Sequence, residues 1–188
     1  MTTVGTLYNV HPAMEQERRH DYVKHYLQQR DHIKEGDVLL FAGRGLWSSL
    51  IKLWTNSHYS HVGLVAMWGE RLMCLESIEG KGVRAVPLSQ LVAEYHGLIH
   101  WYSLRDTEYI RAMAVSWAIE QLGSEYSWRQ IAALMFGKTC DMDKAKWICS
   151  EFVQRALAKG HAAIDKQVMV PDDITRISGM EYRGVLNQ

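Results

Sequence analysis

The chain has 188 residues, and its 21 basic side chains balance its 21 acidic ones. This length fits one well-filled domain. The balanced charge gives no strong field toward nucleic acid or acidic lipid, so nucleic-acid binding is not expected. Three cysteines, an odd number without a close-spaced pair, argue against a disulfide framework and suit a reducing compartment.

The first residues contain no basic segment followed by an apolar core, and no apolar run approaches membrane-spanning length. We therefore expect a chain that is cytoplasmic as synthesised and has no transmembrane segment. A role outside the cytosol would need delivery by lysis or by a dedicated secretion system. Charged, helix-prone residues between Pro12 and Ile33 predict a peripheral helix, so residues 1–35 are expected to form a helical extension.

The body of the fold is expected to begin at a turn, Lys34–Asp37, which leads into a short apolar strand, Val38–Phe41. After a glycine-containing loop, Trp47 and Trp54 belong to an apolar stripe at helical spacing. Core packing is the ordinary use of such a stripe. The alternative is that the two tryptophans line a groove for an apolar substrate or contact a membrane surface.

Residues 61–68 read as a strand buried on both faces, because apolar residues fill both sets of alternating positions. His61 is the first residue of this strand. A histidine at the open end of a buried strand can both titrate and contact a substrate. The plainer interpretation is a polar residue that closes the strand.

The next apolar run, residues 72–78, predicts a partner strand after a tight reversal. With a two-residue loop, Trp68 faces Arg71, and Glu76 lies on the same face as His61 and diagonal to it. A four-residue loop would place the two side chains opposite one another, whereas a three-residue loop would separate them. A buried glutamate needs a partner such as an imidazole N–H, and the alternative is a Glu76 on an exposed face.

Further strands are predicted over residues 82–86 and 98–104, and we expect all of these strands to form an antiparallel meander. Helical spacing or composition predicts helices over the ranges 88–95, 107–122 and 127–136, followed by a polar loop over 137–144.

A last helix is predicted from Trp147 to Gly160, so Cys149 lies in its first turn and faces inward. The positive end of a helix dipole stabilises a thiolate at such a position. The alternative for Cys149 is a small buried hydrophobic residue. Cys74 lies within a strand and Cys140 in a loop, and neither has this setting.

Several motifs together resemble the permuted branch of the NlpC-type papain-like cysteine hydrolases, and most of all the YiiX-like group. They are Ser60–Gly63 at the start of a strand, Glu76 on the next strand, Ile148–Val153 at the start of a late helix, and the flanking segments Gly36–Leu39 and Val170–Ile174. The order His, acid, Cys is what the permutation implies. The resemblance implies an α+β fold, with an antiparallel sheet packed against helices, and a hydrolase domain over residues 36–188.

The resemblance also implies roles for the site residues, with no cofactor. Cys149 would be the nucleophile, His61 the general base and then acid, and Glu76 the group that orients the imidazole. The Cys149 backbone N–H would meet the oxyanion, together with a second donor for which His58 and Tyr59 are the nearest candidates. We also expect His58 and Tyr59 to contact the substrate.

The expected reaction is hydrolysis of an amide or ester through an acyl-thioenzyme, most of all in short or cell-wall-type peptides. A lipid acylhydrolase or acyltransferase is the alternative that the tryptophan stripe favours, and a non-catalytic binding module is a second one. A zinc site made of His58, His61 and Cys149 is not expected, because a fourth ligand is missing. The oligomeric state stays open.

Overall fold

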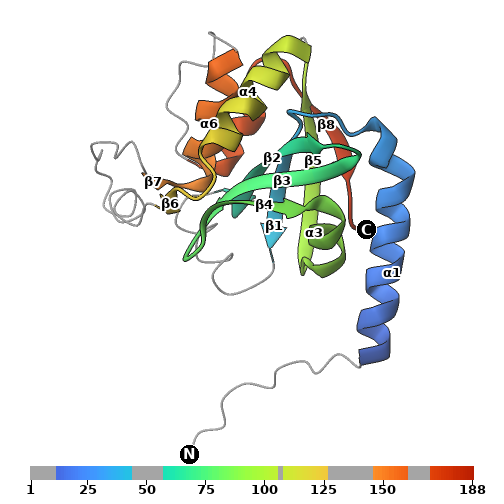
Figure 1. Ribbon diagram of the computed structural model, residues 1–188. Helices are drawn as coiled ribbons and strands as arrows, with labels where there is room; N and C mark the ends of the chain where they lie inside the picture. Colours follow the sequence, from blue (N-terminus) through green and yellow to red (C-terminus); the bar gives the residue numbers. More distant parts are fainter. Residues whose placement is uncertain (1–11, 44–56, 106–107, 127–145, 161–169) are drawn as a thin grey trace, which may run out of the picture.

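A computed structural model describes residues 12–43, 57–105, 108–126, 146–160 and 170–188 of the chain. These residues form a six-stranded antiparallel sheet with helices on both of its faces, which is the expected α+β architecture (Figure 1). The helices are α1 (Pro12–Gln29), η1 (Arg30–His32), α3 (Leu88–Glu94), α4 (Glu108–Glu120), α6 (Cys149–Gly160) and η2 (Pro171–Arg176). The strands are β1 (Val38–Gly43), β2 (His61–Trp68), β3 (Arg71–Ile78), β4 (Gly82–Pro87), β5 (Gly97–Leu104), β6 (Glu125–Tyr126), β7 (Lys146–Trp147) and β8 (Met180–Val185).

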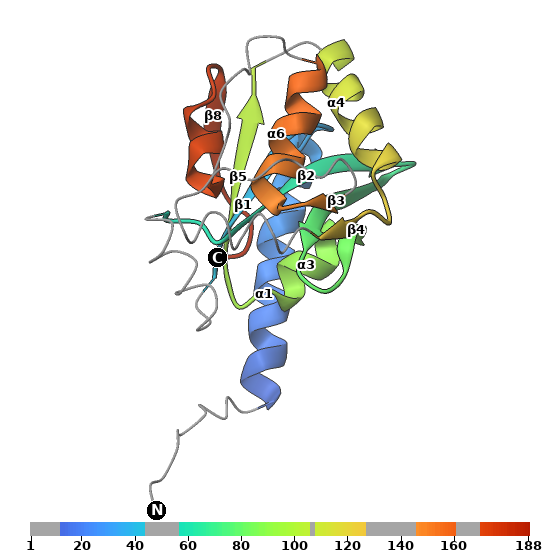
Figure 2. The same ribbon diagram turned by 90° about the vertical axis from the view of Figure 1, so that its left-hand side faces the viewer.

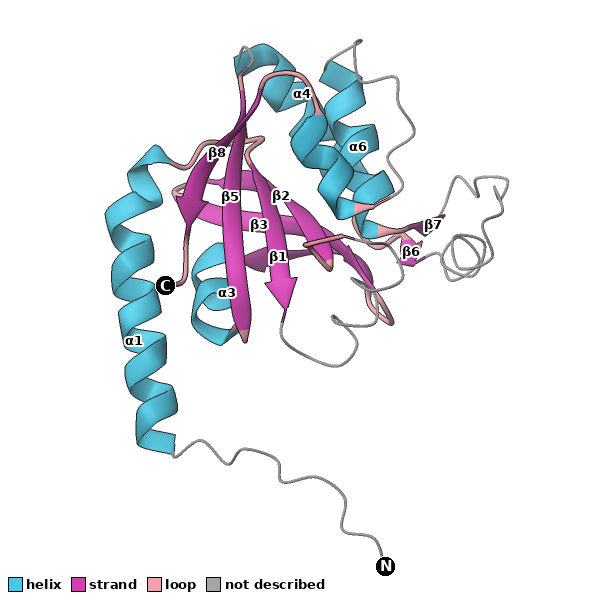
Figure 3. Cartoon of the chain, turned by 180° about the vertical axis from the view of Figure 1, so that it is seen from behind, coloured by secondary structure: helices cyan, strands magenta, loops and turns pink. Residues whose placement is uncertain are grey.

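The strand order of the large sheet is β4-β3-β2-β1-β5-β8. The expected meander is therefore wrong for β5, which pairs with β1 and not with β4. The reason is α3, which separates β4 from β5 and carries the chain along one face of the sheet to the free edge of β1 (Figure 3). Periodicity identifies a strand but does not identify its neighbours.

Two helical layers enclose the sheet. Helices α4 and α6 contact each other on one face, and α1 contacts α3 on the other (Figures 1 and 2). The peripheral helix expected near the N-terminus is α1, whose Tyr26 is buried against the sheet. The division of the chain at residue 35 stays a prediction.

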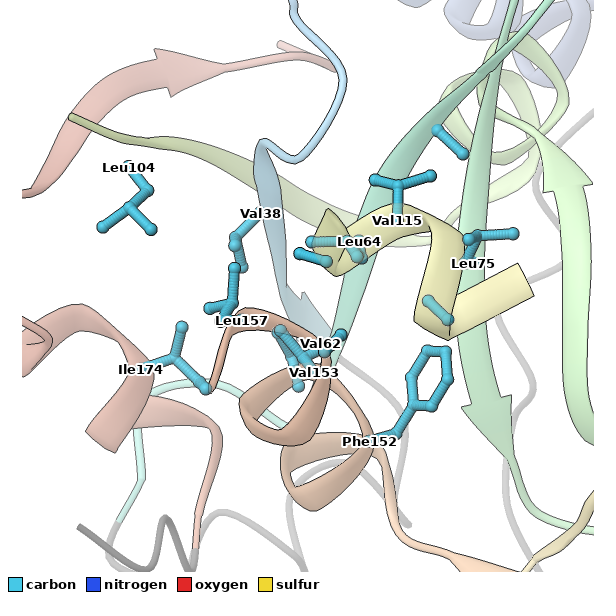
Figure 4. Packing of buried hydrophobic residues seen from close by; sticks show 14 of the residues in the cluster. Val38, Val62, Leu64, Leu75, Leu104, Val115, Phe152, Val153, Leu157 and Ile174 are labelled. Carbon is cyan, nitrogen blue, oxygen red and sulfur yellow. The ribbon is translucent and has the colours of Figure 1, made fainter. Parts of the chain in front are cut away.

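The alternating residues of β2 enter two separate hydrophobic clusters, as the sequence predicts for a strand covered on both faces. Val62 and Leu64 pack with Phe152 and Val153 of α6, and Figure 4 shows these side chains interlocking. Val65 lies on the opposite face in the cluster that also contains Tyr26. Each cluster removes a layer of apolar side chains from water, and the first one fixes the position of α6 relative to β2.

Asp37 is the polar anchor at the start of β1, and its side chain is fully buried. Its carboxylate accepts hydrogen bonds from Trp101 Nε1 at 2.7 Å and Ser103 Oγ at 2.8 Å, and it forms an ion pair with Arg111 of α4. Gly36 precedes it with φ at +79°, and a Cβ atom there would lie 2.9 Å from the Arg111 side chain. The Gly-Asp pair therefore connects β1, β5 and α4 at one point.

Three short strands were not expected from the sequence. β8 forms the edge of the sheet, where Tyr182 is exposed and the alternation of apolar and polar residues is weak. β6 and β7 are two-residue strands that pair in parallel, and β7 directly precedes α6. The helix predicted over 127–136 and the loop over 137–144 lie outside the described residues.

Candidate active site

His61 is the first residue of β2, as expected. It stands opposite Phe41 of β1, and the two rings lie 5.1 Å apart between centroids. The ring is mostly covered, with 18% of the side chain exposed. A strand end of this kind leaves one side of an imidazole open to other elements while the remainder is held in place by packing.

Glu76 lies beside His61 because of the register between β2 and β3. Trp68 pairs with Arg71, so the connection is the two-residue loop that the sequence analysis considered first. The resulting contact joins His61 Nε2 and Glu76 Oε2 at 2.8 Å. Glu76 is only 2% exposed, so the predicted face and the predicted partner are both confirmed.

Cys149 reaches the same point from α6. Cys149 lies in the first turn of the helix, as predicted, but the helix begins at Cys149 and Trp147 belongs to β7. The buried side chains of Phe152, Val153 and Ala156 hold this face of the helix against the sheet. The Cys149 sulfur forms a hydrogen bond with the His61 ring. Because Nε2 of His61 is engaged by Glu76, the other ring nitrogen is the one available to the sulfur.

The electrostatics of the site favour the charged forms of His61 and Glu76. Burial disfavours the imidazolium, but hydrogen bonds and charge interactions with Cys149 and Glu76 outweigh it and raise the pKa of His61 to about 10. Burial also disfavours the carboxylate, yet the contacts of Glu76 with His61 and Arg84 lower the pKa of this carboxyl to about 2. An imidazolium–carboxylate pair therefore persists across neutral pH.

Arg84 is a neighbour of Glu76 that sequence reasoning missed. It lies directly opposite Glu76 in the pairing of β3 with β4 and donates to Glu76 Oε1 from Nε at 2.8 Å and from Nη2 at 2.6 Å. If residues 79–81 are taken as a three-residue loop between β3 and β4, the register places Arg84 opposite Glu76, so the sequence contained this signal. The site is therefore a line of four side chains from four elements: Cys149, His61, Glu76 and Arg84.

The segment before His61 is held by Asp172 of η2, which sequence reasoning also missed. Asp172 accepts hydrogen bonds from Ser57 Oγ, from the backbone N–H groups of His58 and Tyr59, and from the His58 ring, all at 2.9 to 3.2 Å. Burial alone would raise the pKa of Asp172, but these hydrogen bonds hold it below the usual range. Asp172 thus fixes the approach of the chain to β2.

These contacts bear on the expected substrate-binding residues. The His58 side chain is 88% exposed, and its Nδ1 is oriented by Asp172, which leaves Nε2 toward solvent. The Tyr59 hydroxyl pairs with that of Tyr102 at 2.9 Å, and the ring packs against the hydrophobic core. A role of either residue in substrate binding stays a prediction. Trp47 and Trp54 lie outside the described residues.

The remaining cysteines differ from Cys149. Cys74 is fully buried in β3, and burial raises the pKa of its thiol well above the usual value. Cys140 lies outside the described residues. Within the described ranges no three His, Cys, Asp or Glu side chains form a metal-binding group, and no helix there is long and apolar enough to cross a membrane.

Comparisons with known proteins concern the family and the fold of this chain. The sequence model of a family described as "permuted papain-like amidase enzyme, YaeF/YiiX, C92 family" matches residues 32–175. A crystal structure described as the metalloprotein YiiX from Escherichia coli O157:H7 resembles the chain with a TM-score of 0.58 and 21% sequence identity, over 71% of this chain and 69% of that one. At this identity the likeness concerns the fold. A search of curated proteins found no match.

Proposed function

This chain belongs to the family of permuted papain-like amidases represented by YaeF and YiiX, and on that premise we propose that it cleaves an amide bond through an acyl-thioenzyme on Cys149. One observation carries the proposal. Side chains from α6, β2 and β3 meet in line, with Cys149 in contact with His61 and His61 2.8 Å from Glu76. A binding module on this fold would not require a thiol, an imidazole and a buried carboxylate in contact.

The first half of the reaction acylates the enzyme. The Cys149 thiolate attacks the carbonyl carbon, and the oxyanion that forms meets the backbone N–H of Cys149, which lies in the first helical turn and has no acceptor within the helix. His61 then transfers its proton to the amine nitrogen as the C–N bond breaks. The amine leaves, and a thioester remains on Cys149.

The second half releases the acid. Neutral His61 removes a proton from water as the water oxygen attacks the thioester carbon, and the C–S bond breaks. The products are the carboxylic acid, the Cys149 thiolate and the imidazolium of His61. Glu76 holds one ring orientation throughout, because its hydrogen bond to Nε2 fixes which nitrogen faces the sulfur.

The substrate that we propose is an amide of a short peptide of the cell-wall type. The description of the family as amidases supports an amide over a lipid ester. The tryptophan stripe that favoured a lipid in the sequence lies outside the described residues.

The test compares wild-type protein with Cys149→Ala, and with Cys74→Ala as the matched cysteine control. Each is incubated with purified stem peptides and, separately, with phosphatidylcholine vesicles, and the products are followed by mass spectrometry. We expect peptide cleavage by the wild type and by Cys74→Ala, and none by Cys149→Ala. Release of fatty acid without peptide cleavage would overturn the peptide assignment.

A further inference from the structure

The two oxygen atoms of the Glu76 carboxylate serve different partners. Oε2 accepts from His61 at 2.8 Å, whereas Oε1 accepts both bonds from Arg84. Building on the amidase function proposed above, we propose that Arg84 is a positioning residue, which engages one oxygen of the carboxylate and so keeps His61 acidic enough to protonate the leaving amine.

The position of Arg84 follows from the sheet. Directly paired residues on adjacent antiparallel strands have Cβ atoms about 5 Å apart, which brings the guanidinium group of Arg84 to the Glu76 carboxylate. Two N–H groups from one rigid plane fix Oε1, so Oε2 is left to face the imidazole. Because Glu76 is 2% exposed, water does not compete for either contact.

The charges of the site explain why a second cation is useful. His61 lies between the Cys149 sulfur and the Glu76 carboxylate, and its interactions with both stabilise the imidazolium. An imidazolium that is too stable is a weak acid, and general-acid catalysis is most efficient when the pKa of the acid is near the working pH. Arg84 lowers the proton affinity of His61, because its positive charge partly neutralises the Glu76 carboxylate that stabilises the imidazolium.

The acylation step also changes the charge that Glu76 experiences. As the sulfur–carbon bond forms and the C–N bond breaks, the proton moves from the His61 ring to the amine nitrogen, and the imidazole becomes neutral. At that point Arg84 is the cationic partner that Glu76 retains. A buried carboxylate without a cation would be costly, so Arg84 keeps Glu76 paired through the half of the cycle in which His61 is uncharged.

The experiment measures the titration of His61 directly. NMR follows the His61 ring protons against pH in a Cys149→Ala background, which removes the interaction of the sulfur with His61 and so lowers the midpoint. The variant His61→Gln assigns the signals. Arg84→Gln keeps a donor for Oε1 without the charge, Arg84→Met fills the space without polar atoms, and Arg84→Lys keeps the charge. Arg71→Gln, at the exposed start of β3, is the matched control.

We expect the His61 midpoint to rise by about one pH unit, a tenfold gain in proton affinity, in both neutral variants. Arg84→Lys and Arg71→Gln should leave it unchanged. An unchanged or lower midpoint in a folded neutral variant would overturn the proposal and leave Arg84 as a purely structural partner of Glu76. Since the titration needs no turnover, failure of the wild type to cleave amides would count against the proposed function alone. On an amide that the wild type cleaves, Arg84→Gln should lower kcat about tenfold at unchanged KM.

Discussion

Gly63 makes room for Cys74 on the sheet face that carries the Glu76 carboxylate. A Cβ atom at position 63 would lie 2.4 Å from Cys74 Sγ and 3.2 Å from the Leu75 carbonyl oxygen. Unbonded heavy atoms prefer about 3.5–4 Å, so Gly63→Ala forces a displacement of about 1 Å between β2 and β3. Overpacking of this kind costs about 1–3 kcal/mol of stability.

The same displacement reaches the candidate site, because Glu76 follows Cys74 by two residues on the same face of β3. A misplacement of about 1 Å can lower a reaction rate about 100-fold. We therefore expect Gly63→Ala to lower both the free energy of unfolding, measured by tryptophan fluorescence in urea, and the rate of amide hydrolysis.

Cys74→Ala removes the sulfur that collides with the added methyl group, so it should rescue Gly63→Ala. The double variant should recover about 1–3 kcal/mol relative to the sum of the two single changes, together with most of the hydrolysis rate. Additive effects in the double variant, or a Gly63→Ala protein as stable as the wild type, would refute the reasoning.

Iodoacetamide at pH 6 should alkylate Cys149 first, because Cys149 lies at the start of α6 in contact with His61, and it should leave buried Cys74 unmodified; peptide mapping that shows another cysteine labelled first contradicts the nucleophile assignment. Asp172→Ala should lower the free energy of unfolding by about 2–3 kcal/mol, measured in urea, and should also lower the hydrolysis rate. Asp172→Asn retains an acceptor, so both losses should be smaller. Asp37→Ala should lower the free energy of unfolding by about 3–5 kcal/mol, because the buried guanidinium of Arg111 loses its carboxylate partner. A loss of only a few tenths of a kcal/mol in urea unfolding would exclude this. The pKa of the Glu76 carboxyl is about 2 when folded and 4.5 in the unfolded reference, so its stabilisation is present above pH 4.5 and falls as the pH drops toward 2. Between pH 6 and pH 3 the wild type should lose about 2 kcal/mol through this group, and Glu76→Gln should lack that part of the slope.

The sequence could predict most of the candidate site because two of its determinants are local. Register across a two-residue loop fixes the face of Glu76 relative to His61, and the first turn of a helix fixes the direction of Cys149. Both follow from short-range geometry. The contact between the His61–Glu76 pair and the start of the Cys149 helix is long-range, and only the resemblance to a family predicted it.

The parts that the sequence did not predict depend on long-range pairing. Asp172 contacts a segment 113 to 115 residues earlier in the chain, and no periodicity reports such a contact. The placement of β5 beside β1 depends on where α3 leads the chain. Arg84 is intermediate, since the alternation of residues 82–86 placed it on a strand but left the length of the preceding loop open.

The order of the site residues along the chain has a consequence for protein synthesis. His61, Glu76 and Arg84 lie on three consecutive strands, whereas Cys149 begins a helix that comes 65 residues after Arg84 in the chain. At about 5–20 residues per second, the ribosome adds Cys149 about 3–13 s after Arg84. A nascent chain can therefore pair the strands that carry these three side chains before Cys149 is made. Under the proposed function, a partly made chain that lacks α6 would therefore be unable to hydrolyse amides.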